Sequence, residues 1–411
     1  MKHILIIGFV WPEPNSSAAG SRMLQLLTLF RAQQWQVTFA SAASESSHMT
    51  NLTDIGVNKV SIELNNSSFD TFIKELQPDI VLFDRFMIEE QFGWRVIKHC
   101  PDALRILNTE DIHSLRKTRQ EQHTAQKKFE LKNLLDNDIT KREIASIHRS
   151  DISLIISDFE MKLLHEFFEI KKEQLFYLPF LLDPITQETK KKWPHYEERE
   201  NFITIGNFRH APNWNSILYL KETIWPLIRK QLPKAELHIY GAYPPPKATQ
   251  LQNTNEGFYI KGWAKDADEV MQKARVCLAP LRFGAGIKGK LTEAMLCGTP
   301  SITTSIGAEG MIDPESDWNG FITDTPSSFA KSATQLYTNK FLWQQSQQNG
   351  IEIINTRFQK HSFSERFINH LTTTLETIKN HRSNNFIGSI LNYHTLRSTE
   401  YLSRWIEEKN K

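Results

Sequence analysis

The chain has 411 residues, of which 40% are hydrophobic and 23% are charged, close to the usage of an ordinary folded protein. Because a single hydrophobic core rarely grows beyond roughly 250–300 residues, this length predicts two domains. The 49 Lys and Arg residues nearly balance the 47 Asp and Glu residues, so the formal net charge is +2. This balance excludes the strong positive field that is typical of nucleic-acid-binding proteins.

The cysteines and the hydropathy pattern indicate the compartment. Cys100, Cys277 and Cys297 are far apart and lie in apolar surroundings, so we expect reduced core residues in a reducing compartment. No run approaches the 18 to 20 apolar residues that a membrane span needs, and a cytoplasmic location is expected. The Lys190–Lys192 run is typical of a solvated loop, but a peripheral contact with the inner face of the membrane stays open.

Short apolar runs alternate with longer helical patterns along the whole chain. The runs are Ile4–Phe9, Val37–Ala40, Ile80–Phe83, Phe202–Ile205, Leu237–Tyr240 and Val276–Ala279. Continuously apolar strands that alternate with helices are typical of parallel sheets covered on both faces. The pattern predicts an α/β protein with two doubly wound, Rossmann-like domains.

Two segments divide the chain further. The stretch Asp183–Glu200 has a proline near each end, two charge blocks and almost no apolar periodicity, which favours a linker. The last segment, Ile387–Lys411, has apolar residues at helical spacing and is expected to dock on the body. The predicted division is a Rossmann-like domain at 1–185, a second at 186–375 and a C-terminal helical segment at 376–411.

Residues 276–311 form the most informative segment. The strand Val276–Ala279 leads into a turn with Gly284, Gly286 and Gly289, and a helix follows. Such a turn lets backbone N–H groups approach a ligand, and the helix N-terminus favours an anion. Lys288 and Lys290 flank the turn. Cations at the start of a helix interact unfavourably with the macrodipole. A bound phosphate would compensate for this interaction and so explain why two lysines stand there. The alternative is a tight βα turn with solvent-facing lysines.

The segment resembles the donor-binding signature of the family 4 retaining glycosyltransferases, in which a glycine-rich turn precedes a helix with Glu-Ala-Met and then Gly-x-Pro. The matching residues are Gly284, Gly286, Lys288, Lys290, Glu293, Ala294, Met295, Gly298 and Pro300. The resemblance implies a GT-B fold, in which two Rossmann-like domains face a cleft. It also implies a nucleotide-sugar donor, UDP- or GDP-linked, as substrate, with no separate cofactor.

One position departs from the family pattern. The family usually carries two glutamates separated by seven residues, the first near the transferred sugar and the second on the ribose. Glu293 stands at the second position, whereas Ala285 stands at the first. Lys288 is the candidate replacement for the missing contact to the sugar.

Further segments resemble other parts of the family's donor site. IGNFRHAPNW resembles the loop where a basic residue reaches the diphosphate, and Arg209 matches that residue; a planar guanidinium suits phosphate. Trp263, in IKGWAKD, is either a neighbour of the base or a core residue. The resemblance therefore implies a donor side with Arg209, Trp263, Lys288, Lys290 and Glu293.

The N-terminal half supplies the remaining candidates. Gly20 lies in a loop that resembles the one over the transferred sugar, and His113, with Asp111 beside it, matches a family histidine close to the donor sugar. Catalytic roles are accordingly expected for His113, Arg209, Lys288 and Glu293. Acceptor contacts are expected from Asp84 and Arg85, which follow a strand; a salt-bridged helix start is the alternative for the segment from Phe83 to Arg95. Arg22, at a matching place in the loop that resembles the one over the transferred sugar, and Asp111 are expected on the same acceptor side.

The pair Asp266 and Asp268 has the spacing of a metal-binding DxD motif. At the start of an expected helix, acidic residues cap and complement the dipole. We therefore expect helix capping here and no catalytic metal.

The sequence thus predicts a hexosyltransferase that moves a sugar from a nucleotide donor to a saccharide or lipid-linked acceptor. The resemblance implies retention of the anomeric configuration and a role in bacterial surface polysaccharide synthesis. Two alternatives stay open: a sugar-nucleotide 2-epimerase of the same fold, and a catalytically silent nucleotide-sugar binding protein, which Ala285 suggests.

Overall fold

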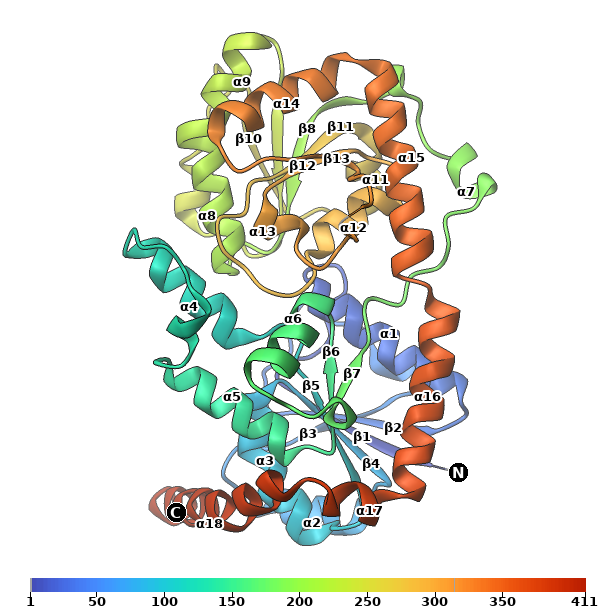
Figure 1. Cartoon of the computed structure of the whole chain (residues 1–411), viewed down its shortest axis with the longest axis vertical. Helices are drawn as coiled ribbons and strands as arrows, with labels where there is room; N and C mark the ends of the chain where they lie inside the picture. The colour runs from blue at the N-terminus through green and yellow to red at the C-terminus, as the bar shows by residue number, and fades with distance from the viewer. Residues whose placement is uncertain (1, 314) are drawn as a thin grey trace.

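The computed structural model describes residues 2–313 and 315–411, without the side chains of residues 395 and 396. Two lobes lie one above the other along the long axis of the molecule (Figure 1). The N-terminal lobe holds a parallel sheet of seven strands in the order β3-β2-β1-β4-β5-β6-β7, and the C-terminal lobe holds a parallel sheet of six in the order β10-β9-β8-β11-β12-β13. The predicted architecture of two doubly wound α/β units facing one another is confirmed.

The first part of the chain forms the sheet of the N-terminal lobe and the helices that lie between its strands. The strands are β1 (His3–Gly8), β2 (Gln36–Ser41), β3 (Asn58–Ser61), β4 (Ile80–Asp84), β5 (Leu104–Asn108), β6 (Ile152–Ile155) and β7 (Leu175–Tyr177). The helices are α1 (Ala18–Ala32), α2 (Ser68–Leu76), α3 (Phe86–His99), α4 (His113–Thr124), α5 (Asp138–Arg149) and α6 (Asp158–Lys162).

The C-terminal lobe repeats this plan. Its strands are β8 (Glu200–Ile205), β9 (Leu237–Tyr240), β10 (Phe258–Gly262), β11 (Ala274–Ala279), β12 (Ser301–Thr303) and β13 (Gly320–Ile322). Its helices are α8 (Ala211–Tyr219), α9 (Trp225–Gln231), α10 (Pro246–Thr249), α11 (Ala267–Lys273), α12 (Gly289–Leu296), α13 (Ser305–Ala308), α14 (Pro326–Thr338) and α15 (Lys340–Arg357).

Each buried strand serves two cores, which explains its continuous apolar run. Ile4 and Ile6 of β1 pack with α1 on one face of the sheet, whereas Leu5 and Ile7 pack with α2, α3 and α5 on the other. Successive side chains of a strand point to opposite faces, so a strand covered on both sides must be apolar at every position.

The segment after β7 joins the two sheets and carries the short helix α7 (Gln187–Lys191). The chain returns to the N-terminal lobe earlier than the predicted boundary at 375. Helix α16 (Lys360–Glu376) already packs Phe367 and Leu371 into the core formed by β1 and α1. Figure 1 shows α15 and α16 running in succession from the upper lobe to the lower.

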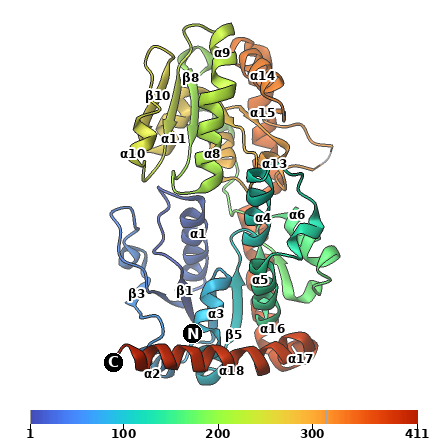
Figure 2. The ribbon, with the colours of Figure 1, turned by 90° about the vertical axis from the view of Figure 1, so that its left-hand side faces the viewer.

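The chain ends with α17 (Ile378–Ser383) and α18 (Phe386–Lys409). Figure 2 shows α18 lying across the end of the N-terminal lobe that is remote from the C-terminal lobe; it contacts α3 and α5. None of the helices in the described part of the chain combines the length and apolar character that crossing a bilayer requires. All three cysteines are buried and free.

Candidate functional site

A pocket of about 1080 Å³ lies between the two lobes. Its walls come from the loops that follow β1, β4 and β5 in one lobe and β8, β10 and β11 in the other. In open parallel sheets, ligands bind outside the carboxyl ends of the strands, where the strand order reverses. Here β1 meets β4, and β8 meets β11, so both reversal points face the same pocket.

The glycine-rich turn contacts the opposite lobe directly. Gly286 has a φ of 62°, and a Cβ built on it would lie 2.8 Å from Cβ of Asp111. A Cβ on Gly289 would lie 2.4 Å from Cβ of Ala18, the first residue of α1. These glycines therefore allow the N-termini of α1 and α12 to meet across the lobe boundary.

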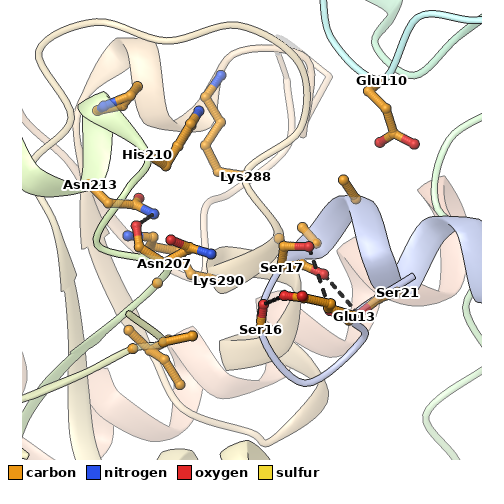
Figure 3. A pocket seen from close by; sticks show the side chains of 18 of the residues that line it. Glu13, Ser16, Ser17, Ser21, Glu110, Asn207, His210, Asn213, Lys288 and Lys290 are labelled. Atoms are coloured by element: carbon orange, nitrogen blue, oxygen red, sulfur yellow. Dashed lines mark hydrogen bonds between the residues drawn. The ribbon is translucent and has the colours of Figure 1, made fainter. Parts of the chain in front are cut away.

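The turn also presents cations and amides to the pocket. Lys288 and Lys290 line it, and Lys288 Nζ donates to Gly286 O at 2.8 Å (Figure 3). Among the described residues neither lysine forms an ion pair with a carboxylate. Lys288 is the N-cap of α12, and no side chain caps that helix. The first amides of α12 are therefore available to an anion.

Burial perturbs the charges around α12. It lowers the pKa of Lys288 and of Lys290 to about 8, and the Glu309 carboxylate opposes the effect on Lys288. Burial, and then the charge of Asp268, raises the pKa of Glu293 to about 7. An incoming phosphate would add negative charge next to two lysines that burial disfavours in the charged form.

The loops after β8 and β10 complete the C-terminal wall. Arg209 lies 3.8 Å from the ring centroid of Tyr243 and is exposed on the pocket side. Trp263 is 40% exposed, so it is not a core residue, and its Nε1 donates to Asn15 O across the cleft at 3.0 Å. Asp266 caps α11 by accepting from the amide of Glu269.

His113 and Asp111 line the N-terminal wall. His113 Nε2 lies 3.2 Å from Asp111 Oδ1, and Arg116 donates to both oxygens of that carboxylate at 2.6 and 3.3 Å. Burial lowers the pKa of His113 to about 4, so this ring is neutral at pH 7. Although burial opposes it, the charges of Arg116 and His113 lower the pKa of Asp111.

Three predicted site residues lie outside the pocket lining. Gly20 is inside α1, where a Cβ would meet the backbone of Glu13 at 2.3 Å. Arg22 is 1% exposed and donates to Pro179 O and Asn108 Oδ1. Asp84 is 4% exposed and accepts from the amide of Phe9. These three residues pack behind the residues that line the pocket. Arg85 and the remaining predicted residues are part of the lining.

Other groups in and around the pocket carry no signal in the sequence. Glu13 lines it and accepts from Ser16, Ser46 and Tyr243. Glu160, which is fully buried, accepts from the amides of Ile112 and Gly286 at 2.9 and 2.8 Å, one from each lobe. Apart from the contact between Glu13 and Ser16, these hydrogen bonds join residues far apart in the chain, and local patterns do not report them.

Arg119 forms a second link between the lobes. It donates to the carboxylate of Glu309 at 2.7 and 2.8 Å and to Gly284 O at 2.8 Å. The glycine-rich turn is thus held from the N-terminal lobe at both Gly284 and Gly286. The two lobes are therefore in direct contact through this turn.

Residues 199–339 match the family model described as glycosyl transferases group 1. Sucrose-phosphate synthase from Thermosynechococcus elongatus is similar in structure, with a TM-score of 0.66, 16% identity and coverage of 92% of this chain and 100% of that one. HepE of Anabaena, solved with UDP and glucose, has a TM-score of 0.66 and 12% identity, and the match covers 90% of this chain and 100% of that one. WaaG, a glycosyltransferase involved in lipopolysaccharide biosynthesis, has a TM-score of 0.60 and 14% identity, and the match covers 88% of this chain and 98% of that one.

These structures share the GT-B fold that the sequence implied, over nearly the whole of both chains. Identities of 12 to 16% establish the fold and leave the substrates to the site itself. Among curated proteins, no sequence matches this chain.

Proposed function

From a C-terminal lobe that matches the group 1 glycosyltransferases, we propose that this protein moves a sugar from a nucleotide donor to a saccharide or lipid-linked acceptor. The observation that carries the proposal is the pair of lysines, unpaired with any carboxylate among the described residues, at an uncapped helix N-terminus inside the interlobe pocket. An anion with several oxygens satisfies such a site. The diphosphate of a nucleotide sugar is such an anion.

Each wall has a role in this proposal. Lys288, Lys290, Arg209 and the first amides of α12 hold the diphosphate, and Glu293 holds the ribose. Trp263 borders the base, which is uracil or guanine. HepE was solved with UDP, which supports uracil. His113 faces the transferred sugar, and Arg85 and Asp111 face the acceptor.

The reaction is a substitution at the anomeric carbon with retention. The bond from that carbon to the leaving phosphate oxygen breaks, and its electron pair moves to the diphosphate. The acceptor hydroxyl attacks from the same face, and its proton passes to the departing phosphate oxygen. Negative charge therefore grows on the diphosphate, where fixed cations and amides stabilise the transition state most effectively.

The proposal is tested by incubating the protein with UDP- and GDP-sugars, with and without saccharide acceptors. We expect release of nucleoside diphosphate that depends on the acceptor, and NMR of the product should show the anomeric configuration of the donor. An inverted linkage would refute retention. An epimerised donor formed without acceptor would favour the 2-epimerase, and tight donor binding with no turnover would favour the silent binding protein.

Contact with the inner face of a bacterial membrane, and a role in surface polysaccharide synthesis, are part of the proposal. WaaG is involved in lipopolysaccharide biosynthesis, which supports that role. The exposed face of α18 supports the contact, because it presents Phe386, Ile387, Ile390, Tyr393, Tyr401, Leu402 and Trp405, each between 44 and 74% exposed. Aromatic rings with basic side chains beside them are typical of helices that lie on an anionic bilayer.

Two of the three acidic residues of α18 contact the N-terminal lobe, whereas the exposed Glu408 pairs with Lys411. Glu400 pairs with Lys98 and Glu407 accepts from Ser67, both on the N-terminal lobe. Arg397 and Lys409 instead lie over the rings of Tyr393 and Trp405 at 4.8 and 5.2 Å. We therefore assign the outer face of α18 to an anionic membrane surface rather than to a second copy of the chain.

Vesicle sedimentation tests this assignment. The protein is expected to bind vesicles with anionic lipid, and the double substitution Tyr401→Ser, Trp405→Ser should reduce binding by about tenfold or more because apolar burial and electrostatic attraction both contribute. Phe341→Ser is the matched control, since Phe341 is 78% exposed on the other lobe. Equal binding by all three proteins, or loss of a dimer in the double variant, would contradict the assignment.

A further inference from the structure

Two strained residues stand side by side at the edge of the N-terminal sheet. Arg85 directly follows β4 and has a φ of 75°, and Glu110, two residues after β5, has a φ of 63°. The two strands are paired, with Asp84 opposite Asn108, and the amide of Arg85 donates to Asn108 O at 2.8 Å. A left-handed conformation is unfavourable for such side chains and persists where the surrounding structure holds it, most often at functional sites.

The carboxylate of Glu110 is held in place by a hydrogen bond from a buried side chain. Asn108 is fully buried and orients it, because Asn108 Oδ1 accepts from Arg22 Nε at 3.4 Å while Asn108 Nδ2 donates to Glu110 Oε1 at 2.7 Å. Among the described residues, no hydrogen bond reaches the second oxygen, Oε2. Figure 3 shows the Glu110 side chain projecting toward the interior of the pocket.

Glu110 is adjacent to the residue that touches the donor turn. Asp111 lies so close to Gly286 that a Cβ there would approach to 2.8 Å. In the C-terminal lobe, the position before Gly286 is Ala285, which is 9% exposed and packs in the hydrophobic cluster of the N-terminal lobe. The turn therefore supplies no carboxylate at that position, whereas Glu110, next in sequence to the residue that touches the turn, supplies one to the same pocket.

We propose that Glu110 hydrogen-bonds the hydroxyl groups of the sugar carried by the donor, and so determines which donor sugar the protein accepts. Burial, and then the charge of Asp84, raises the pKa of Glu110 to about 7. Sugar hydroxyls both donate and accept, so they match this carboxyl group in its ionised form, which only accepts, and in its protonated form, which also donates. Arg85 lines the same wall, and a guanidinium has only N–H donors to offer to the sugar. This inference rests on the proposed function and deepens it, because it concerns the sugar half of the same ligand.

The test separates sugar recognition from nucleotide recognition. Dissociation constants are measured by calorimetry for two pairs of ligands, UDP with UDP-glucose and GDP with GDP-mannose. The variants are then tested with the pair in which the sugar increases the affinity of the original protein more, that is, in which the nucleoside diphosphate has the larger dissociation constant relative to its nucleotide sugar. In Glu110→Gln, the nucleotide sugar is expected to bind about tenfold or more weakly, because an amide N–H then faces a hydroxyl donor. The nucleoside diphosphate should bind within about twofold of its original affinity.

A second variant controls for folding. Glu110→Gly removes the same carboxylate but suits the left-handed backbone, so its melting temperature should be retained or raised while the nucleotide sugar binds more weakly. Equal weakening of both ligands in either variant, unchanged binding of both, or an increase confined to the acceptor KM would overturn the inference. An unchanged protein that binds neither nucleoside diphosphate nor nucleotide sugar would overturn the proposed function itself.

Discussion

Lys288→Ala is expected to lower kcat by about 10²–10³-fold, the scale of losing one preorganised donor to a developing negative charge. Lys288 is held at the N-cap of α12 by its own hydrogen bond to Gly286 O, so its charge is in place before the donor arrives. The release of nucleoside diphosphate with acceptor present measures the effect. Lys331→Ala is the matched control, because Lys331 is exposed on α14, remote from the pocket lining.

The melting temperature of Lys288→Ala distinguishes a loss of catalysis from misfolding. Lys288 is desolvated without an ion-pair partner among the described residues, and burial lowers its pKa to about 8. Removing a desolvated cation relieves a cost, so the melting temperature of Lys288→Ala should be retained or raised without ligand. Near-normal turnover in this variant would remove Lys288 from the diphosphate site, and a large fall in melting temperature would make it a structural residue.

Gly289→Val is expected to lower kcat/KM by about 10²-fold or more. Any Cβ at this position would meet Cβ of Ala18 at 2.4 Å, and a branched side chain cannot turn away from a neighbouring helix. The lobes must then separate, and a displacement of about 1 Å at reacting groups is enough for a loss of this size. Steady-state kinetics measure the loss, and small-angle scattering should show a larger radius of gyration.

Gly284→Ala is the matched control for this prediction. It lies in the same turn, but its Cβ would meet Lys288 Cε at 3.6 Å and Ile306 at 3.8 Å, which are ordinary contacts. We expect Gly284→Ala to keep most of the activity and the original radius. If Gly289→Val were as active as the control, the contact between α1 and α12 would not belong to the working state.

Much of the fold follows from local patterns in the chain. The apolar runs of β1 and β8 predicted buried parallel strands, because a strand covered on two faces must be apolar at each position. The turn that precedes α12 was recognisable as well, since its glycines, its lysines and the helix after it lie within one short window. The structure places Gly284, Gly286, Lys288, Lys290 and Glu293 together in the pocket lining, while their catalytic and binding roles stay predictions.

Other parts of the site depend on contacts between distant segments. Arg22 and Asp84 were expected at the acceptor, but the packing of α1 against β4 and β5 buries them behind Asn108. Trp263 could be read as a base neighbour or as core, and its 40% exposure excludes the core. Local sequence patterns do not show whether a polar side chain points into the pocket or into the protein interior, because burial depends on every element packed around that residue.

The chain alone was enough for the α/β class, the strands and the glycine-rich turn, since each is encoded by neighbouring residues whose spacing matches a strand, a turn or a helix. The contacts between the two lobes could not be predicted in this way. Three contacts each require two lobes to be brought together: Glu160 with Gly286, Arg119 with Glu309, and Asp111 with Gly286. Such contacts join residues more than a hundred positions apart, and their energies arise only when the assembled surfaces meet.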